Sequence, residues 1–156
     1  MRFDNLFTAK VSVRGTWRNC FITIYQNEHI ASKGFGHYKV SDPFDKNFLP
    51  VYLSGSEVDH SAGKGLQSST AELVLNGWFA TKIGISDQMM VNVERLEDVS
   101  TCASLDLHPF SEDDWEILLL NKDLIENSLL DQVRLVYFSQ IFPCWLDDSM
   151  CIFLKV

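Results

Sequence analysis

The hydrophobic pattern of this 156-residue chain changes at the stretch Ser111-Glu112-Asp113-Asp114-Trp115-Glu116-Ile117-Leu118. Before Pro109 the apolar residues alternate with a period of two, which is typical of half-buried strands, and after it they recur with helical spacing. Ser111 followed three residues later by Asp114 is typical of a capped helix start, and the acidic residues there suit the positive end of the helix dipole. We therefore expect an α+β domain that is mainly β up to about residue 108, with both main helices between Ser111 and Phe138.

The segment after the first helix predicts a second helix and a hairpin. The second helix is expected to begin near Asn121 or Asp123, with an apolar stripe facing the core that comprises Ile125, Leu129, Val133 and Val136. Two final strands are expected on either side of the turn Asp147-Asp148-Ser149. Pro143 has no N–H, so the first of these strands should lie at an edge or carry a bulge.

The first two thirds of the chain predict short strands. Those expected are Phe7 to Val13, Cys20 to Tyr25, Val51 to Ser54, Ala71 to Leu75, Gln88 to Leu96 and a segment with Ala103, Leu105 and Leu107 that ends at Pro109. A helical turn is expected from Gly77 to Gly84, with Trp78, Phe79 and Ile83 on one stripe. Residues 32–50 contain two glycines and two prolines and are expected to be irregular. Residues 56–69 are expected to form a polar loop.

Composition favours a folded domain. Hydrophobic residues make up 46% and aromatic residues 12% of the chain, which is enough apolar material for a packed core. The sequence has no apolar run of the roughly 18 to 20 residues that span a bilayer. Residues 1–5 contain no apolar core of a secretory signal, so we expect a cytosolic or nuclear location, or a peripheral one at a membrane. The four cysteines form no Cys-x-x-Cys pair, and the histidines are scattered, so we expect reduced thiols and no metal site.

The net charge of −8 is unevenly distributed. Residues 1–84 hold nine Lys or Arg against seven Asp or Glu, a balance of +2, while residues 85–156 hold four against fourteen, a balance of −10. An acidic second half repels nucleic acid and anionic lipid. We therefore expect no nucleic-acid partner, and any anionic partner must approach the first half.

Catalytic and cofactor motifs are missing from the sequence. Ser61-Ala62-Gly63-Lys64-Gly65 resembles a phosphate-binding loop, but Val58 and Gly65 occupy positions at which that motif has glycine and Ser or Thr. The acidic cluster at residues 112–116 is explained by solvation of a helix start. We predict no catalytic, cofactor-binding or metal-binding residues.

One candidate binding surface remains, comprising Lys10, Arg14, Trp17 and Arg18. Trp17 stands in a short loop between two arginines, and an exposed aromatic ring flanked by cations can bind an anionic headgroup or an acidic peptide. Alternatively, Trp17 folds back over the end of the domain, and the arginines are merely solvated.

Residues 105–156 resemble the N-terminal domain of the peroxin-1 family, which are AAA+ ATPases of peroxisome biogenesis. The resemblance rests on the acidic-aromatic helix start, the Leu129-Leu130-Asp131-Gln132-Val133-Arg134 helix, the Ile141-Phe142-Pro143-Cys144-Trp145 strand and the final Ile152-Phe153 strand. Residues 7–98 match loosely. The resemblance implies an N-terminal double-psi β-barrel over 1–98 and a smaller C-terminal α/β lobe over 99–156, together one AAA+ N-terminal domain. The family's glycine-bearing turn before the last barrel strand is here Ser86-Asp87-Gln88.

The resemblance implies an adaptor or substrate-recognition domain acting in peroxisomal matrix protein import and receptor recycling, in the cytosol and peripherally at the peroxisomal membrane. Expected partners are proteins of the import machinery, including a second AAA+ peroxin. Because Val156 ends the sequence without ATPase modules, we expect ATP and magnesium only in the parent's modules and no cofactor in this chain. The alternatives are a peripheral phosphoinositide-binding module and, more remotely, a free-standing barrel enzyme.

Overall fold

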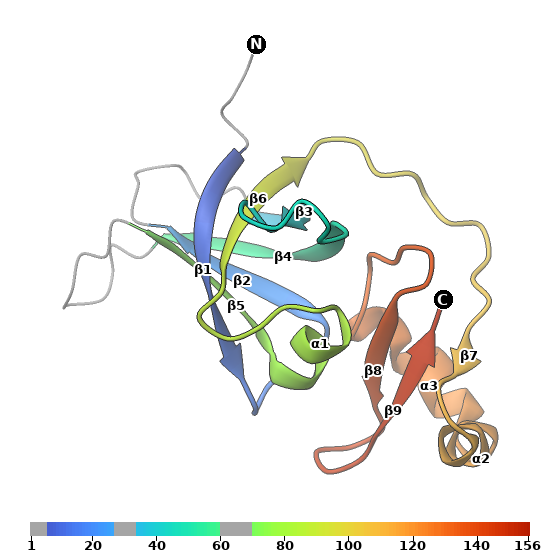
Figure 1. Ribbon diagram of the computed structural model, residues 1–156. Coiled ribbons are helices and arrows are strands. Elements are labelled where there is room, and N and C mark those ends of the chain that lie inside the picture. Colours follow the sequence, from blue (N-terminus) through green and yellow to red (C-terminus); the bar gives the residue numbers. More distant parts are fainter. Residues whose placement is uncertain (1–5, 27–33, 60–69) are drawn as a thin grey trace.

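A closed six-stranded barrel forms the first part of the computed structural model, which describes residues 6–26, 34–59 and 70–156 (Figure 1). Its strands are β1 (Leu6–Arg14), β2 (Phe21–Gln26), β3 (Gly34–Ser41), β4 (Val51–Asp59), β5 (Ala71–Asn76) and β6 (Met90–Leu96). Around the barrel they follow the order β1-β5-β2-β4-β3-β6. The short helix α1 (Gly77–Lys82) connects β5 towards β6 and closes one end.

The strand pairing has an internal twofold pattern. β1 pairs with β5 and β2 with β4 in parallel, while β1–β6 and β3–β4 are antiparallel. The two remaining pairs, β2–β5 and β3–β6, are also antiparallel. Exchanging β1, β2 and β3 for β4, β5 and β6 leaves every one of these pairings unchanged. The barrel is therefore built from two topologically equivalent halves.

A glycine is required where β4 passes β2. A Cβ atom built on Gly55 would lie 1.9 Å from the backbone oxygen of Ile22. Real Cβ atoms do not approach backbone oxygens so closely, so any other residue would push the two strands apart. The close approach of β2 and β4 therefore depends on Gly55.

The turn before β6 adopts a glycine-like conformation without glycine. Gln88 has a φ of 66°, in the left-handed region. Backbone bonds tie this turn to β1, since Val11 N donates to Met89 O at 2.8 Å and Gln88 N donates to Val11 O at 2.9 Å. Asp87 Oδ1 accepts a further bond from Val13 N at 3.0 Å. These bonds hold the turn in place although its sequence departs from the family pattern.

The second part of the chain combines two helices with a small sheet. Its elements are β7 (His108–Pro109), α2 (Glu112–Leu120), α3 (Lys122–Ser128), a 3₁₀ turn (Leu129–Asp131), β8 (Ile141–Trp145) and β9 (Cys151–Lys155). The sheet order is β7-β9-β8, so β8 with Pro143 is an edge strand, as predicted. The predicted cap is also confirmed, because Asp114 N donates to Ser111 Oγ at 3.1 Å.

Four local predictions were wrong. Residues 34–41 are a strand, β3, because the neighbours β4 and β6 supply hydrogen bonds on both sides despite the glycines. The strand expected over 103–109 shrinks to His108–Pro109. The common stripe expected for Trp78, Phe79 and Ile83 is broken, because Trp78 is 57% exposed while Phe79 and Ile83 are buried. The helical stripe from Ile125 is also interrupted, since α3 ends at Ser128.

One hydrophobic cluster joins the barrel to the second part. It includes Val11 and Leu73 of the barrel and Phe79 of α1 together with Phe142 and Leu154 of the C-terminal sheet, all of them buried. In Figure 1, α1 lies between the barrel and β8. Among the residues that the structure describes, no helix is long and apolar enough to cross a bilayer.

Candidate functional site

The structure places Lys10, Arg14, Trp17 and Arg18 on β1 and the loop that follows it, and we call these four residues the β1 cationic face. Lys10 and Arg14 lie four positions apart on β1, so both point to the same side, and both are exposed. Arg14 Nη2 is 3.9 Å from Glu72 Oε1 of the adjacent strand β5. Trp17 and Arg18 are half-buried in the loop between β1 and β2.

The Arg18 side chain links the loop after β1 to the turn between β8 and β9. Its Nε donates to Asp148 O at 2.9 Å, in the turn between β8 and β9, and its Nη1 donates to Gly15 O at 2.6 Å. The backbone of Trp17 is also held, because its carbonyl accepts from Asn76 Nδ2 at 2.6 Å. The expectation that both arginines are free at the surface is therefore wrong for Arg18. Lys10 and Arg14 are the two exposed cations of the face.

A surface hollow of about 290 Å³ lies where the barrel meets the C-terminal sheet. Trp78, Thr81 and Lys82 of α1 line it on one side and Phe153 of β9 on the other. Asn76 Oδ1 caps α1 by accepting from Phe79 N at 3.0 Å, and Phe79 is buried. That orientation leaves Trp78 57% exposed. We call this site the junction hollow.

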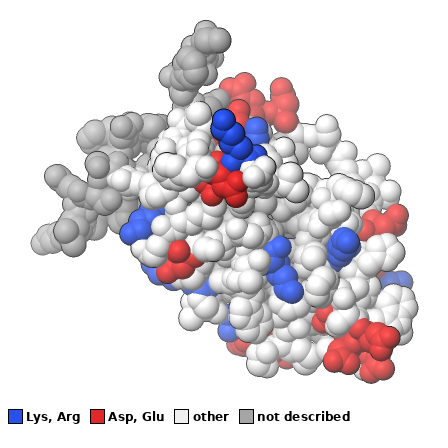
Figure 2. Space-filling view, in the orientation of Figure 1, with Lys and Arg blue, Asp and Glu red and all other residues white. Residues whose placement is uncertain are grey.

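Lys82 gives the junction hollow a positive charge. Its Nζ lies 4.4 Å from the ring centroid of Phe110 and 4.6 Å from that of Phe153. Contact with two ring faces stabilises an ammonium group without neutralising it. Within residues 6–26, 34–59 and 70–156, no carboxylate lies within 4.0 Å of this group. The hollow therefore offers apolar ring surface and an unneutralised cation side by side, within a surface that is mainly uncharged over α1 and β9 (Figure 2).

Gln132 connects the barrel with the C-terminal sheet. Its side-chain Nε2 donates to Trp145 O at 2.8 Å, and its Oε1 accepts from Trp145 N at 2.7 Å, so the amide pairs with the outer edge of β8 as another strand would. Its backbone oxygen accepts from Cys20 N of the barrel at 2.8 Å. These three bonds tie β8 to the barrel, and α1 and β9, which line the junction hollow, belong to those two parts of the structure.

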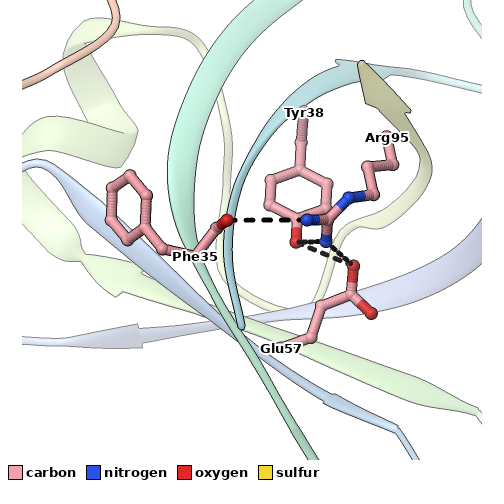
Figure 3. A network of polar contacts seen from close by, with 4 residues as sticks. All are labelled: Phe35, Tyr38, Glu57 and Arg95. Atoms are coloured by element: carbon pink, nitrogen blue, oxygen red, sulfur yellow. Dashed lines mark hydrogen bonds and ion pairs between the residues drawn. The ribbon is translucent and has the colours of Figure 1, made fainter. Parts of the chain in front are cut away.

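A buried ion pair lies inside the barrel, between β3, β4 and β6 (Figure 3). Arg95 Nη1 lies 2.9 Å from Glu57 Oε1 and 3.0 Å from the hydroxyl of Tyr38, which itself donates to Glu57 at 2.7 Å. A Cβ on Gly36 would lie 2.8 Å from Arg95 Cζ, so the glycine makes room for the guanidinium. Burial and the bond to Glu57 raise the pKa of Tyr38. The groups satisfy one another, which is typical of a structural network.

Sequence reasoning did not find the junction hollow. Lys82, Phe110 and Phe153 are far apart in the chain, and only the packing of α1 against the C-terminal sheet brings them together. The phosphate-loop mimic at 61–65 lies outside the described residues. Among those described, no group of three or more His, Cys, Asp or Glu side chains is placed to hold a metal ion.

These features define the class of the chain, an α+β domain with a closed barrel, a small C-terminal sheet accompanied by two helices, and a surface hollow between barrel and sheet. Residues 103–156 match the family described as peroxisome biogenesis factor 1, N-terminal. The chain is 36% identical to peroxisomal ATPase PEX1 of Homo sapiens over 107 residues. The aligned region covers 69% of this chain and 8% of that protein. The same protein of Cricetulus griseus is 34% identical over the same share of both chains.

A more distant relative extends the comparison. Peroxisomal ATPase PEX1 of Dictyostelium discoideum is 33% identical over 73 residues, which are 47% of this chain and 6% of that protein. The chain belongs to the family of peroxisome biogenesis factor 1 N-terminal domains, as the resemblance in sequence implied. It spans about 8% of the length of the first two relatives. In them, the matched region is an N-terminal domain and not the ATPase module.

Proposed function

We propose that this chain is an adaptor or substrate-recognition domain of a peroxisomal biogenesis AAA+ ATPase, which acts in peroxisomal matrix protein import and receptor recycling. The observation that carries the proposal is the junction hollow, where Lys82 stands unneutralised between two aromatic rings. The family match supports the peroxisomal assignment. The ATPase activity named for the relatives belongs to far longer proteins, and the proposal does not extend it to this chain.

The proposed architecture is that of a double-psi barrel with a second lobe. The twofold pairing of β1–β3 with β4–β6 supports the double-psi assignment, because such barrels consist of two interlocking halves. We place the barrel lobe at 1–98 and the α/β lobe at 99–156, as parts of one N-terminal domain. The long connection after β6, which leaves the barrel before β7, supports that boundary (Figure 1).

The junction hollow suits a protein segment that carries a carboxylate next to an aromatic or aliphatic side chain. The carboxylate would pair with Lys82, and the apolar group would pack against Trp78 and Phe153. A charge pair flanked by ring surface gains from both partial desolvation and apolar burial. Partners of this kind would be proteins of the peroxisomal import machinery, and a second AAA+ peroxin would join them in the parent complex.

Other properties follow from the same proposal. The chain binds without catalysing a reaction and needs no cofactor or metal, since ATP and magnesium would be held by the ATPase modules of the parent. Nucleic acid is not a partner, because the second half of the chain is strongly acidic. The domain would work in the cytosol, associated peripherally with the peroxisomal membrane.

Site-specific photo-crosslinking tests the junction hollow. A benzoylphenylalanine placed at Thr81, which lines the hollow, should crosslink to peroxisomal import proteins when the chain is incubated with cytosol and peroxisomal membranes. The same group at Thr101, which is exposed outside the hollow, is the matched control. Lys82→Glu should remove the Thr81 crosslinks, because it places like charges together. Crosslinks that persist in Lys82→Glu, or that are equal from both positions, would refute the proposal.

A second candidate function is anionic lipid binding by the β1 cationic face. It is favoured by the exposure of Lys10 and Arg14 on the same side of β1. Each cation near an acidic membrane surface contributes on the order of 1 kcal/mol, screened as salt rises. Lys10→Glu with Arg14→Glu should then abolish flotation with phosphoinositide liposomes while Arg18 keeps its internal bonds. Unchanged flotation of that double variant would exclude the face as a lipid site.

A further inference from the structure

The outer side of α2 exposes an apolar surface that the core does not use. Trp115 is 51%, Leu119 58% and Leu120 85% exposed, whereas Ile117 and Leu118 turn inward against the core. Trp115 and Leu119 stand four positions apart, so they form one stripe along the helix. A half-exposed tryptophan beside an exposed leucine is the kind of surface that protein interfaces bury.

Acidic side chains border this stripe. Glu112, Asp113 and Glu116 are exposed, and α2 contains no Lys or Arg. In the part of the chain that the structure describes, none of the three takes part in an ion pair. Figure 2 shows acidic side chains gathered at the lower right, where Figure 1 places α2. The helix therefore presents apolar and unneutralised anionic groups on one side.

We propose that the outer side of α2 docks a basic amphipathic helix of a partner protein. Its aliphatic stripe would pack along Trp115 and Leu119, and its Lys or Arg side chains would pair with Glu112 and Glu116. Helix recognition by an apolar stripe with a complementary charged border is a common mode of binding. The site is independent of the proposed function, since it lies on another element and selects the opposite charge from the junction hollow.

Charge distinguishes this occupant from the alternatives. An anionic membrane or a nucleic acid would be repelled by the acidic border. A second copy of the chain would bring the same Glu112 and Glu116 towards each other in a symmetric contact, which is unfavourable. A basic helix is the partner that satisfies both the apolar stripe and the carboxylates.

Fluorescence anisotropy with a designed peptide tests the proposal. The probe is a labelled amphipathic helix with one leucine stripe flanked by lysines, and its counterpart carries glutamates in place of the lysines. The parent chain should bind the lysine peptide and not the glutamate peptide. Glu112→Lys with Glu116→Lys should weaken binding by roughly tenfold or more, and Trp115→Ser with Leu119→Ser should do the same.

Two matched controls isolate the surface. Asp98→Lys with Asp106→Lys changes the net charge by the same amount at exposed positions outside α2 and should leave binding intact. Phe138→Ser removes an aromatic ring that is 89% exposed elsewhere and should also have no effect. The proposal fails if the parent does not bind the lysine peptide, or if the two double charge variants weaken binding equally. It also fails if the Trp115 and Leu119 variant binds as the parent does, or if ultracentrifugation shows a dimer that this variant abolishes.

Discussion

Replacing Gln132 by leucine should destabilise the fold far more than the small change in side-chain volume suggests. The Gln132 side chain is buried, and its amide is bonded to both the N–H and the C=O of Trp145. Leucine has a similar size but can pair with neither group. Trp145 is itself buried, so water cannot replace the lost partners without opening β8.

The expected cost follows from the two orphaned groups. Leaving a buried polar group unpaired costs about 1–3 kcal/mol, so two of them cost about 2–6 kcal/mol, of which the greater apolarity of leucine offsets about 1 kcal/mol. A domain of this size has a free energy of unfolding of about 5–15 kcal/mol, so Gln132→Leu should remove a large part of it. Gln140→Leu is the matched control, because Gln140 is also buried and its side chain accepts one bond, from Tyr137 N at 3.1 Å. It should cost about half as much.

Gln132→Glu adds a pH test of the same bonds. A carboxylate can still accept from Trp145 N, but it faces the carbonyl of Trp145 without a proton to donate. Burial and that carbonyl should raise the folded-state pKa of the new glutamate above its unfolded value of about 4.3. A raised pKa stabilises the fold below the unfolded pKa, and this contribution is lost as pH rises through the folded pKa. The variant should therefore recover stability relative to the parent as pH falls.

Urea unfolding followed by circular dichroism, at several pH values, measures all three variants. The shift in the midpoint multiplied by the slope of the transition gives the change in the free energy of unfolding. A loss below about 1 kcal/mol in Gln132→Leu would refute the argument that this amide closes the β8 edge. If the loss of unfolding free energy in Gln132→Glu does not vary with pH, the new carboxylate is solvated and the argument fails.

Three further outcomes are expected. Gly55→Ala should abolish folding, seen as loss of a cooperative thermal transition, because its Cβ would lie 1.9 Å from Ile22 O; a folded variant would show that β2 and β4 can separate. Gln88→Gly should raise the free energy of unfolding by up to about 1 kcal/mol by relieving the left-handed φ of 66°, while Gln88→Val should lower it, and the reverse order would contradict that account. Iodoacetamide at neutral pH should label the exposed Cys102 rapidly and Cys144 only on unfolding, because burial raises the pKa of Cys144 to about 11; mass spectrometry showing equal rates would refute this.

Local signals in the sequence predicted the helical region well. The Ser111 cap, the position of α3 and the β8–β9 hairpin each depend on neighbouring residues, so their patterns are visible without the fold. The alternation over β1 and β2 was equally clear. β3 was missed because its glycines suit no isolated strand, and only barrel closure pairs it on both sides.

The sites were harder to predict because they depend on distant contacts. Arg18 looked like a surface cation, yet the carbonyl of Asp148 in the β8–β9 turn engages it. Trp78 was expected on one stripe with Phe79 and Ile83, yet the helix capped by Asn76 turns Phe79 inward and leaves Trp78 outside. Neither contact follows from spacing along the chain. The bonds between the Gln132 side chain and the Trp145 backbone could not be predicted for the same reason, although the motif around Gln132 supported the resemblance to the family.

The hydrogen bonds of Gln132 and the geometry of the junction hollow depend on each other. Phe153 lies on β9, which is held on one side by β8, and Gln132 fastens the outer edge of β8 to a segment bonded to the barrel. Lys82 lies on α1, which packs against β8 from the barrel side. The distance between Lys82 and the Phe153 ring is therefore set by the same contacts that unite the two parts of the core. A partner seated in the hollow would contact both parts at once, so its binding energy would favour the joined arrangement, and the buried amide of Gln132 would serve recognition without touching the partner.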